Sequence, residues 1–142
     1  MAIKPEELAV EIVIRLDQWG DVVAHGMKNA VDEVTKEVKR EIKSNIPFNN
    51  RTGDYVRAFK TKTIYESNRV KRNAWYVAAP HYRLTHLLEH GHKIFIGTTR
   101  GQRQIHVKGG RTRAFPHIVY GERLANRRLP ELIEAAVKEG SK

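Results

Sequence analysis

The chain has 142 residues, no cysteine and a formal net charge of +10. This length is enough for one domain with one hydrophobic core, and the lack of cysteine excludes a disulfide scaffold and thiolate chemistry. The sequence contains no run of eighteen apolar residues and so predicts no membrane span. Its first residues also lack the apolar core of a signal peptide. We therefore expect a single domain over residues 1–142 that is made in a reducing cytoplasm and has no membrane partner.

The positive charge is concentrated in the later part of the sequence. Residues 1–47 carry 7 basic and 9 acidic residues, a net charge of −2, whereas residues 48–142 carry 19 and 7, a net charge of +12. A segment this basic indicates an interaction with nucleic acid or with an acidic protein surface, although solubility alone would also explain it.

Residues 5–46 predict an N-terminal helical segment. Pro5 at the first helical position, followed by two glutamates, favours a helix start. Apolar residues then recur every three or four positions as far as Ile42, and the segment must end before Pro47 because a residue preceding proline avoids the helical region. Gly20 predicts a break or bend within this segment, since glycine weakens a helix interior.

A short helix, two strands and a histidine-rich segment follow. Thr52 is a candidate cap for a short helix over residues 54–58. The alternation of apolar and polar residues predicts strands over residues 59–66 and 70–79, and Pro80 ends the second strand. Together these strands predict a small antiparallel sheet.

Residues 81–92, H-Y-R-L-T-H-L-L-E-H-G-H, predict a short amphipathic helix. Leu84, Leu87 and Leu88 share one apolar face at spacings of three and four. Gly91 occupies the position where glycine commonly ends a helix, because glycine enters positive φ without a steric penalty. We expect Leu87 or Leu88 to lie in the core and to bridge the sheet and the long helix.

The last third of the sequence predicts a hairpin and a C-terminal helix. Residues 93–107 alternate as a β-hairpin, and Gly109-Gly110 indicate a loop. Pro116 opens a helix that Pro130 should kink or restart. The predicted fold class is α+β: a long N-terminal helix packed on a small antiparallel β-sheet, a C-terminal helix alongside, and a projecting basic β-hairpin.

The clustered histidines raise the question of a metal site. His86 and His90 are four residues apart on one helical face, and His92 or Glu89 could supply a third zinc ligand. The pattern is not H-E-x-x-H, however, and Glu89 points about 100° away from His90 on a helix. Polar histidines near a helix C-terminus, where positive charge is favoured, are the simpler interpretation. With no catalytic motif and no cluster of carboxylates, we expect no enzyme, no cofactor and no bound metal.

Six basic residues with no acid between them form a candidate assembly surface on the hairpin and the loop after it. They are Lys93, Arg100, Arg103, Lys108, Arg111 and Arg113. An exposed run of this kind favours an acidic partner or the phosphates of DNA. The residues do not follow a helix-turn-helix or an aromatic sheet face, so direct readout of bases is not indicated.

Three blocks of the sequence resemble the HK97 gp10-like phage proteins. The first is N-R-T-G-D-Y at 50–55, and the second is Y-R-L-T-H-L-L-E-H-G-H at 82–92. The third is G-G-R at 109–111, followed by F-P-H-I at 115–118 and A-N-R at 125–127. These blocks occur in the same order as in the family, and the resemblance extends over about residues 20–137.

The resemblance implies a structural virion protein of the phage neck, a tail-completion or head–tail joining subunit assembled in the host cytoplasm. It implies a ring of about six or twelve copies, with other neck, connector and tail-tube proteins as partners and DNA passing through the lumen. It implies no catalytic residue and no cofactor. Two departures stand out: Val119-Tyr120 replace the family's proline-alanine pair, and residues 93–104 look like an insertion.

Two other functions stay open at this point. A basic nucleic-acid-binding module would show DNA affinity that falls as salt rises. A metal-dependent enzyme using His86 and His90 would retain stoichiometric metal.

Overall fold

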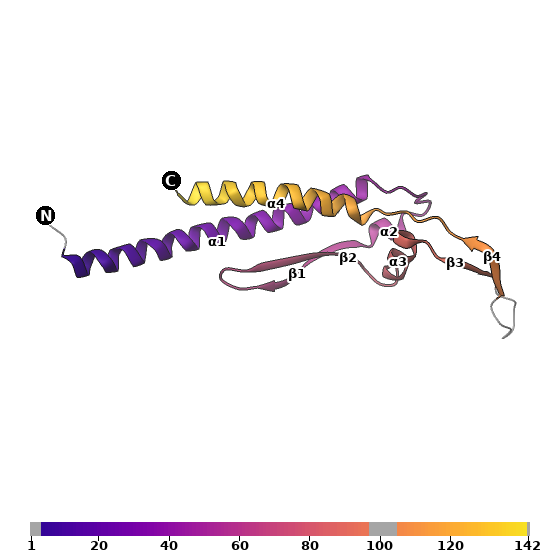
Figure 1. Ribbon diagram of the computed structural model, residues 1–142, viewed down its shortest axis with the longest axis horizontal. Helices are drawn as coiled ribbons and strands as arrows, with labels where there is room; N and C mark the ends of the chain where they lie inside the picture. Colours follow the sequence, from indigo (N-terminus) through magenta and orange to yellow (C-terminus); the bar gives the residue numbers. More distant parts are fainter. Residues whose placement is uncertain (1–3, 97–104, 142) are drawn as a thin grey trace.

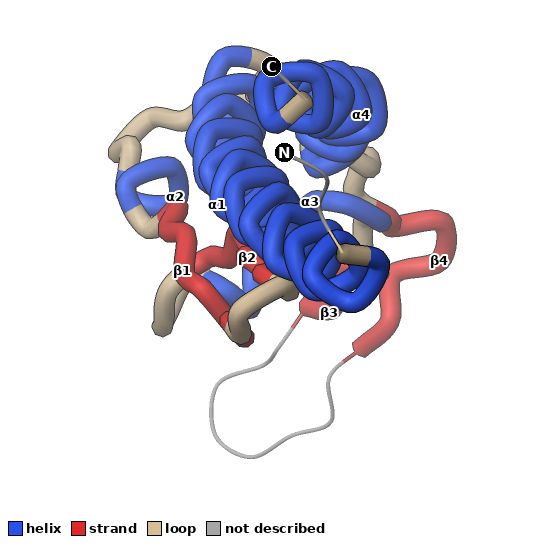
Figure 2. Tube along the Cα trace, turned by 90° about the vertical axis from the view of Figure 1, so that its left-hand side faces the viewer, coloured by secondary structure: helices blue, strands red, loops and turns tan. Residues whose placement is uncertain are grey.

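The computed structural model describes residues 4–96 and 105–141. Its elements, in chain order, are α1 (Pro5–Ser44), α2 (Asp54–Arg57), β1 (Phe59–Glu66), β2 (Lys71–Val77), α3 (Tyr82–His90), β3 (Lys93–Ile96), β4 (Ile105–Arg111) and α4 (Ile118–Gly140). The molecule is elongated along α1, and the β3–β4 hairpin lies at the end far from the N-terminus (Figure 1). Viewed along the long axis, α4 and the β1–β2 hairpin lie on different sides of α1 (Figure 2). The predicted α+β class is confirmed.

α1 is one helix of 40 residues, so the predicted break near Gly20 is wrong. A single glycine costs a helix about 1 kcal/mol, which a helix that is already nucleated on both sides readily absorbs. The helix has Pro5 in its first turn and ends at Ser44, before Pro47, as predicted.

α4 packs antiparallel along α1 through small residues. An ideal Cβ built on Gly121 would lie 2.7 Å from Ile42 Cδ1, and one on Gly26 would lie 2.9 Å from the Ala136 Cβ. The two helix axes can therefore approach more closely than larger side chains would allow. This close packing explains why α4, rather than the sheet, is the main partner of α1.

α4 is continuous through Pro130, so the predicted restart near Leu129 is wrong. Proline in a helix interior costs about 3 kcal/mol through a lost hydrogen bond and a steric clash. Here Pro130 is exposed to solvent, and the residues on either side of it are held against α1. Packing on α1 thus offsets the helix-breaking preference of Pro130, on which the prediction from the sequence was based.

An ion pair fixes the register of the two helices. Arg128 Nε lies 3.0 Å from Glu37 Oε2, and Arg128 Nη2 lies 3.2 Å from Glu37 Oε1, a two-point contact between partly buried groups. The hydrogen bonds from Arg128 lower the pKa of Glu37 below its usual range. Because the carboxylate is favoured in the folded state, this contribution to stability is present above the unfolded pKa and is lost in acid, as pH falls through the folded pKa.

β1 and β2 form an antiparallel hairpin that docks on α1. Their register runs from Phe59 opposite Val77 to Glu66 opposite Lys71, with an irregularity after Thr63. The strand predicted over residues 70–79 is therefore shorter than expected. β3 and β4 form a second, separate two-stranded sheet, in which β4 includes the Gly109-Gly110 pair that was predicted as a loop.

Asp32 of α1 connects the β1–β2 hairpin to the helix. Lys71 Nζ donates to Asp32 Oδ2 at 2.7 Å, and Asn73 Nδ2 donates to Asp32 Oδ1 at 2.9 Å. Asn73 Nδ2 also lies 3.0 Å from Thr35 Oγ1. The hydrogen bond from Lys71, and to a smaller extent the one from Asn73, lowers the pKa of Asp32 below its usual range. These hydrogen bonds hold the inner face of the hairpin against the middle of α1.

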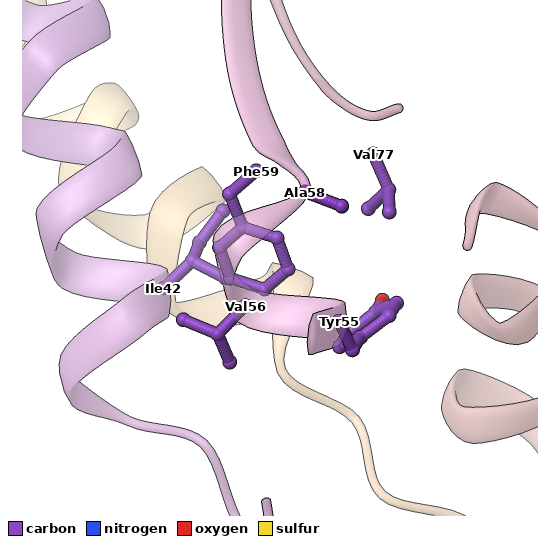
Figure 3. Packing of buried hydrophobic residues seen from close by; sticks show 6 residues of the cluster. All are labelled: Ile42, Tyr55, Val56, Ala58, Phe59 and Val77. Atoms are coloured by element: carbon purple, nitrogen blue, oxygen red, sulfur yellow. The ribbon is translucent and has the colours of Figure 1, made fainter. Parts of the chain in front are cut away.

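The hydrophobic core lies where the end of α1, α2 and the adjoining ends of β1 and β2 meet. It consists of Ile42, Tyr55, Val56, Ala58, Phe59 and Val77 (Figure 3). Leu88 of α3 packs against this cluster, but no residue of α3 is buried, and Leu84 is 42% exposed. The prediction that Leu87 or Leu88 lies inside the core is thus correct for contact and wrong for depth, because α3 covers one end of the cluster.

Replacing Gly121 and replacing Gly20 with alanine should change the free energy of unfolding in opposite directions. Gly121→Ala places a Cβ against Ile42 and should destabilise the protein by about 1–3 kcal/mol through overpacking. Gly20→Ala meets only the flexible end of Arg69 at 3.4 Å and should stabilise it by about 0.5–1 kcal/mol. Urea unfolding followed by circular dichroism measures both, and equal effects would contradict the packing described here.

Candidate functional site

Three segments that are far apart in the sequence meet in a buried polar cluster, which we call the Tyr55–Glu89–His117 cluster. Tyr55 comes from α2, Glu89 from α3, and His117 precedes α4. The His117 side chain is fully buried, and its Nε2 lies 2.9 Å from Tyr55 Oη. Each residue belongs to a different one of the three sequence blocks that resemble the phage family.

Glu89 caps the N-terminus of α4. Its Oε1 accepts hydrogen bonds from the backbone N–H of His117 at 2.8 Å and of Ile118 at 3.0 Å, and it lies 2.7 Å from His117 Nδ1. α4 has no side-chain cap from its own N-cap residue. A carboxylate supplied by α3 therefore satisfies these backbone donors and meets the positive end of the helix dipole.

The hydrogen-bond partners of His117 and Tyr55 come from the backbone and from Thr85. His117 Nδ1 lies 2.8 Å from the Phe115 carbonyl oxygen, which can only accept, so Nδ1 carries a hydrogen. The Tyr55 hydroxyl donates to Thr85 Oγ1 at 3.1 Å and lies 2.9 Å from His117 Nε2. Burial raises the pKa of the Tyr55 phenol, and the Glu89 charge acts in the same direction. The phenol is therefore a neutral hydrogen-bonding group.

Near this cluster, the segment that follows β4 packs against the end of α3. The backbone N–H of Phe115 donates to the Leu88 carbonyl oxygen at 2.6 Å. Gly91 has φ +69°, and a Cβ there would lie 2.5 Å from the Thr112 carbonyl oxygen, so only glycine fits. The cluster and the contacts between residues 88–91 and 112–115 fix the base of the β3–β4 hairpin and the start of α4.

The structure does not bring His86 and His90 together with either candidate for a third zinc ligand, Glu89 or His92. The rings of His86 and His90 lie 4.9 Å apart, but Glu89 is turned toward His117. His92 Nδ1 lies 3.0 Å from Thr112 Oγ1. Within residues 4–96 and 105–141, no group of three or more histidines and carboxylates could hold a metal ion.

The predicted assembly surface is described only in part. Lys93 is exposed and stands opposite Arg111 in the strand register, and Arg111 Nη2 lies 3.3 Å from the His90 carbonyl oxygen. Arg113 is exposed, with its guanidinium carbon 5.8 Å from the centre of the Phe115 ring. Arg100 and Arg103 lie outside the described residues, and for Lys108 only the backbone in β4 is described. This surface stays a prediction.

The sequence analysis missed an exposed apolar segment at the other end of the molecule, residues 5–22, which we call the N-terminal arm. α4 ends beside Val23, because a Cβ on Gly140 would lie 2.7 Å from Val23 Cγ2. The arm therefore projects beyond α4 (Figure 1). Its large apolar side chains are 43–60% exposed: Leu8, Val10, Ile12, Val13, Ile14, Leu16, Trp19 and Val22. The available signal was length, since the predicted first helical segment is much longer than the last.

The N-terminal arm thus exposes apolar side chains at one end of the molecule, and the base of the β3–β4 hairpin exposes Lys93 and Arg111 near the other. The family model described as "Bacteriophage HK97-gp10, putative tail-component" matches residues 11–91, which is more than half of the chain. The chain therefore belongs to the HK97-gp10-like family and is a structural protein of the phage virion. Comparisons with curated proteins and with solved structures gave no significant match.

The matched region differs from the range expected from the three sequence blocks, which was about residues 20–137. It begins within the N-terminal arm and ends at Gly91, so it includes Tyr55 and Glu89 but not His117. Among the described residues, no helix is both long enough and apolar enough to cross a membrane.

Removing the cap should destabilise the whole fold. Glu89→Ala leaves the backbone donors of His117 and Ile118 without their acceptor and should cost about 1–3 kcal/mol in the free energy of unfolding. Glu122→Ala removes the same charge from an exposed position of α4 and should change stability by less than about 0.5 kcal/mol. Chemical denaturation compares the two variants, and equal losses would show that charge rather than capping is responsible.

Proposed function

We propose that this protein is a ring subunit of the phage neck, which completes the tail and joins it to the DNA-filled capsid. The observation that carries the proposal is the pair of chemically different exposed ends. One end presents the apolar N-terminal arm, and the other presents the basic base of the β3–β4 hairpin.

Two unlike surfaces on one subunit are what a head-to-tail assembly requires. A ring of identical subunits is built from heterologous contacts, in which each copy offers a donor surface and a different acceptor surface. The net charge of +10 would also suit a ring through which DNA passes, because cationic subunits offset phosphate charge. A ring of about six or twelve copies, with neighbouring connector and tail-tube proteins, is the assembly we propose.

Reversing the charge at the base of the hairpin should block joining. Lys93→Glu with Arg111→Glu changes two exposed residues that face each other across the strands and should leave the core intact. Lysates carrying this double variant should contain DNA-filled heads and separate finished tails under the electron microscope. Arg123→Glu with Arg127→Glu makes the same charge change on exposed positions of α4 and serves as the control. Normal yields of complete virions from the hairpin variant would contradict its role as an assembly surface.

One observation favours the second candidate, a basic nucleic-acid-binding module. The solvent face of the β1–β2 hairpin carries the exposed cations Lys60, Lys62 and Arg72, and Lys62 Nζ lies 4.8 Å from the centre of the Tyr76 ring. No ion pair involves these cations among the residues that the structure describes. Such a face could contact phosphates in a duplex or in the lumen of a ring.

DNA binding by the isolated chain separates the two candidates. A nucleic-acid-binding module would bind duplex DNA at physiological salt and lose about two units of salt slope on Lys60→Gln with Lys62→Gln. A neck subunit that meets DNA only in an assembled ring should bind weakly, with little change in this variant. We expect the second result from fluorescence anisotropy across a salt series, and tight binding that depends on both lysines would favour the module.

A further inference from the structure

The uncovered face of the N-terminal arm is continuous with a face that is already an interface within the subunit. Leu8, Ile12, Leu16 and Trp19 follow one another at spacings of four and three, and Val23 comes four residues later. Val23 is buried beside the end of α4, whereas the four residues before it are 43–60% exposed. The apolar stripe therefore extends about 20 Å past its last internal partner.

The arm is also acidic. Residues 5–22 contain five acidic residues and one basic residue, a net charge of −4. The single cation, Arg15, is paired with Glu11 on the same helix. A surface that covers the arm must be apolar where it meets the stripe and positively charged around it.

A groove with these properties, which we call the α3 groove, lies far from the arm, beside α2 and α3. It has a volume of about 330 Å³ and lies between the segment after α1 and α3. Phe48, Leu84 and Leu88 supply apolar lining, while Arg51 and His81 supply cationic or polar groups. Among the described residues, Arg51 has no ion-pair partner.

Charge supports this match over pairing between two arms. The acid that lines the groove, Asp54, is already paired with Arg57, and the nearby Glu89 is engaged by His117. Exposed cations lie on α3 and at the base of the hairpin, among them Arg83 and Lys93. Two arms side by side would instead place a charge of −4 against −4, a repulsion that acts within the Debye length of about 10 Å.

We propose that the N-terminal arm of one copy docks in the α3 groove of a second copy of this chain. The apolar stripe would cover the groove floor, and the acidic residues of the arm would face Arg51 and its neighbours. The N-terminal arm and α3 are far apart along the molecule (Figure 1), so each copy could use its arm to bind one copy and its groove to bind another. The contact is heterologous and gives a ring where the rotation closes. This proposal rests on the proposed function, for which it names the contact between subunits.

Mixing two defective variants tests the contact directly. The arm variant is Ile12→Asp with Leu16→Asp, and the groove variant is Leu84→Asp; all three side chains are exposed. The parent chain should self-associate in size-exclusion chromatography with light scattering, and each variant alone should be a monomer. An equal mixture should form a 1:1 heterodimer, because the arm of the groove variant still fits the groove of the arm variant.

One control variant and one further groove variant complete the experiment. Ile64→Asp changes an isoleucine that is 62% exposed on β1 and belongs to neither the arm nor the α3 groove, so it should associate like the parent. Arg51→Glu alters only a rim charge and provides a second groove variant, whose association should weaken most at low salt. Circular dichroism verifies that each variant is folded.

Several outcomes would overturn the proposal. A monomeric parent, or an arm variant that associates like the parent, would remove the arm as a self-docking segment. A monomeric arm variant beside a groove variant that still associates would show that arms pair with each other. A mixture that stays monomeric would show that the two surfaces are not partners. If the heterodimer forms but virions carrying the arm variant join normally, the contact stands and the neck function fails.

Discussion

The fold depends most on the carboxylate of Glu89 at the start of α4. That one oxygen accepts the two backbone donors that open the helix and lies beside the buried ring of His117. A helix end with unsatisfied donors against a buried imidazole would be costly, since each unpaired polar group retains its desolvation penalty. Because Glu89 stands at the end of α3, the capping contact also decides where α3 sits against the core.

The position of α4 then determines which parts of α1 are left uncovered. α4 begins beside the end of α1, runs back along it and ends beside Val23, held in register by Arg128 and Glu37. A helix of 23 residues cannot cover one of 40. The exposed arm is therefore a consequence of unequal helix lengths once the start of α4 is fixed. The same cap thus governs the buried cluster at one end and the free apolar stripe at the other.

Local signals predicted most elements because they depend on neighbours in the sequence. The strand over residues 59–66 and the short helix after Gly53 were predicted from alternation and turn chemistry, and both are present. The predicted break at Gly20 failed because a helix that is nucleated on both sides absorbs a local cost of about 1 kcal/mol. The predicted restart near Pro130 failed because packing of α4 on α1 outweighs a local cost of about 3 kcal/mol. Local signals are weakest where tertiary contacts already stabilise the helix on both sides.

The site was harder to predict than the fold. Glu89 was weighed only as a metal ligand, because its true partners lie 28 and 29 residues further along the chain and no periodic pattern connects them. A hint was present in the start of α4, which lacks a serine, threonine or aspartate at the cap position and so needs an acceptor from elsewhere. The exposure of Leu16 and Trp19 was likewise invisible, since their spacing is that of any buried helical face.

The unbroken length of α1 has a mechanical meaning. A 40-residue helix is about 60 Å long and stiff, so it acts as a lever rather than a tether. A tilt of about 10° at its C-terminal end, where the core holds it, would carry the other tip through roughly 10 Å. A hinge at Gly20 would have absorbed that movement. Without one, a small change in how the core packs against the C-terminal end of α1 is transmitted in full to the position of the N-terminal tip.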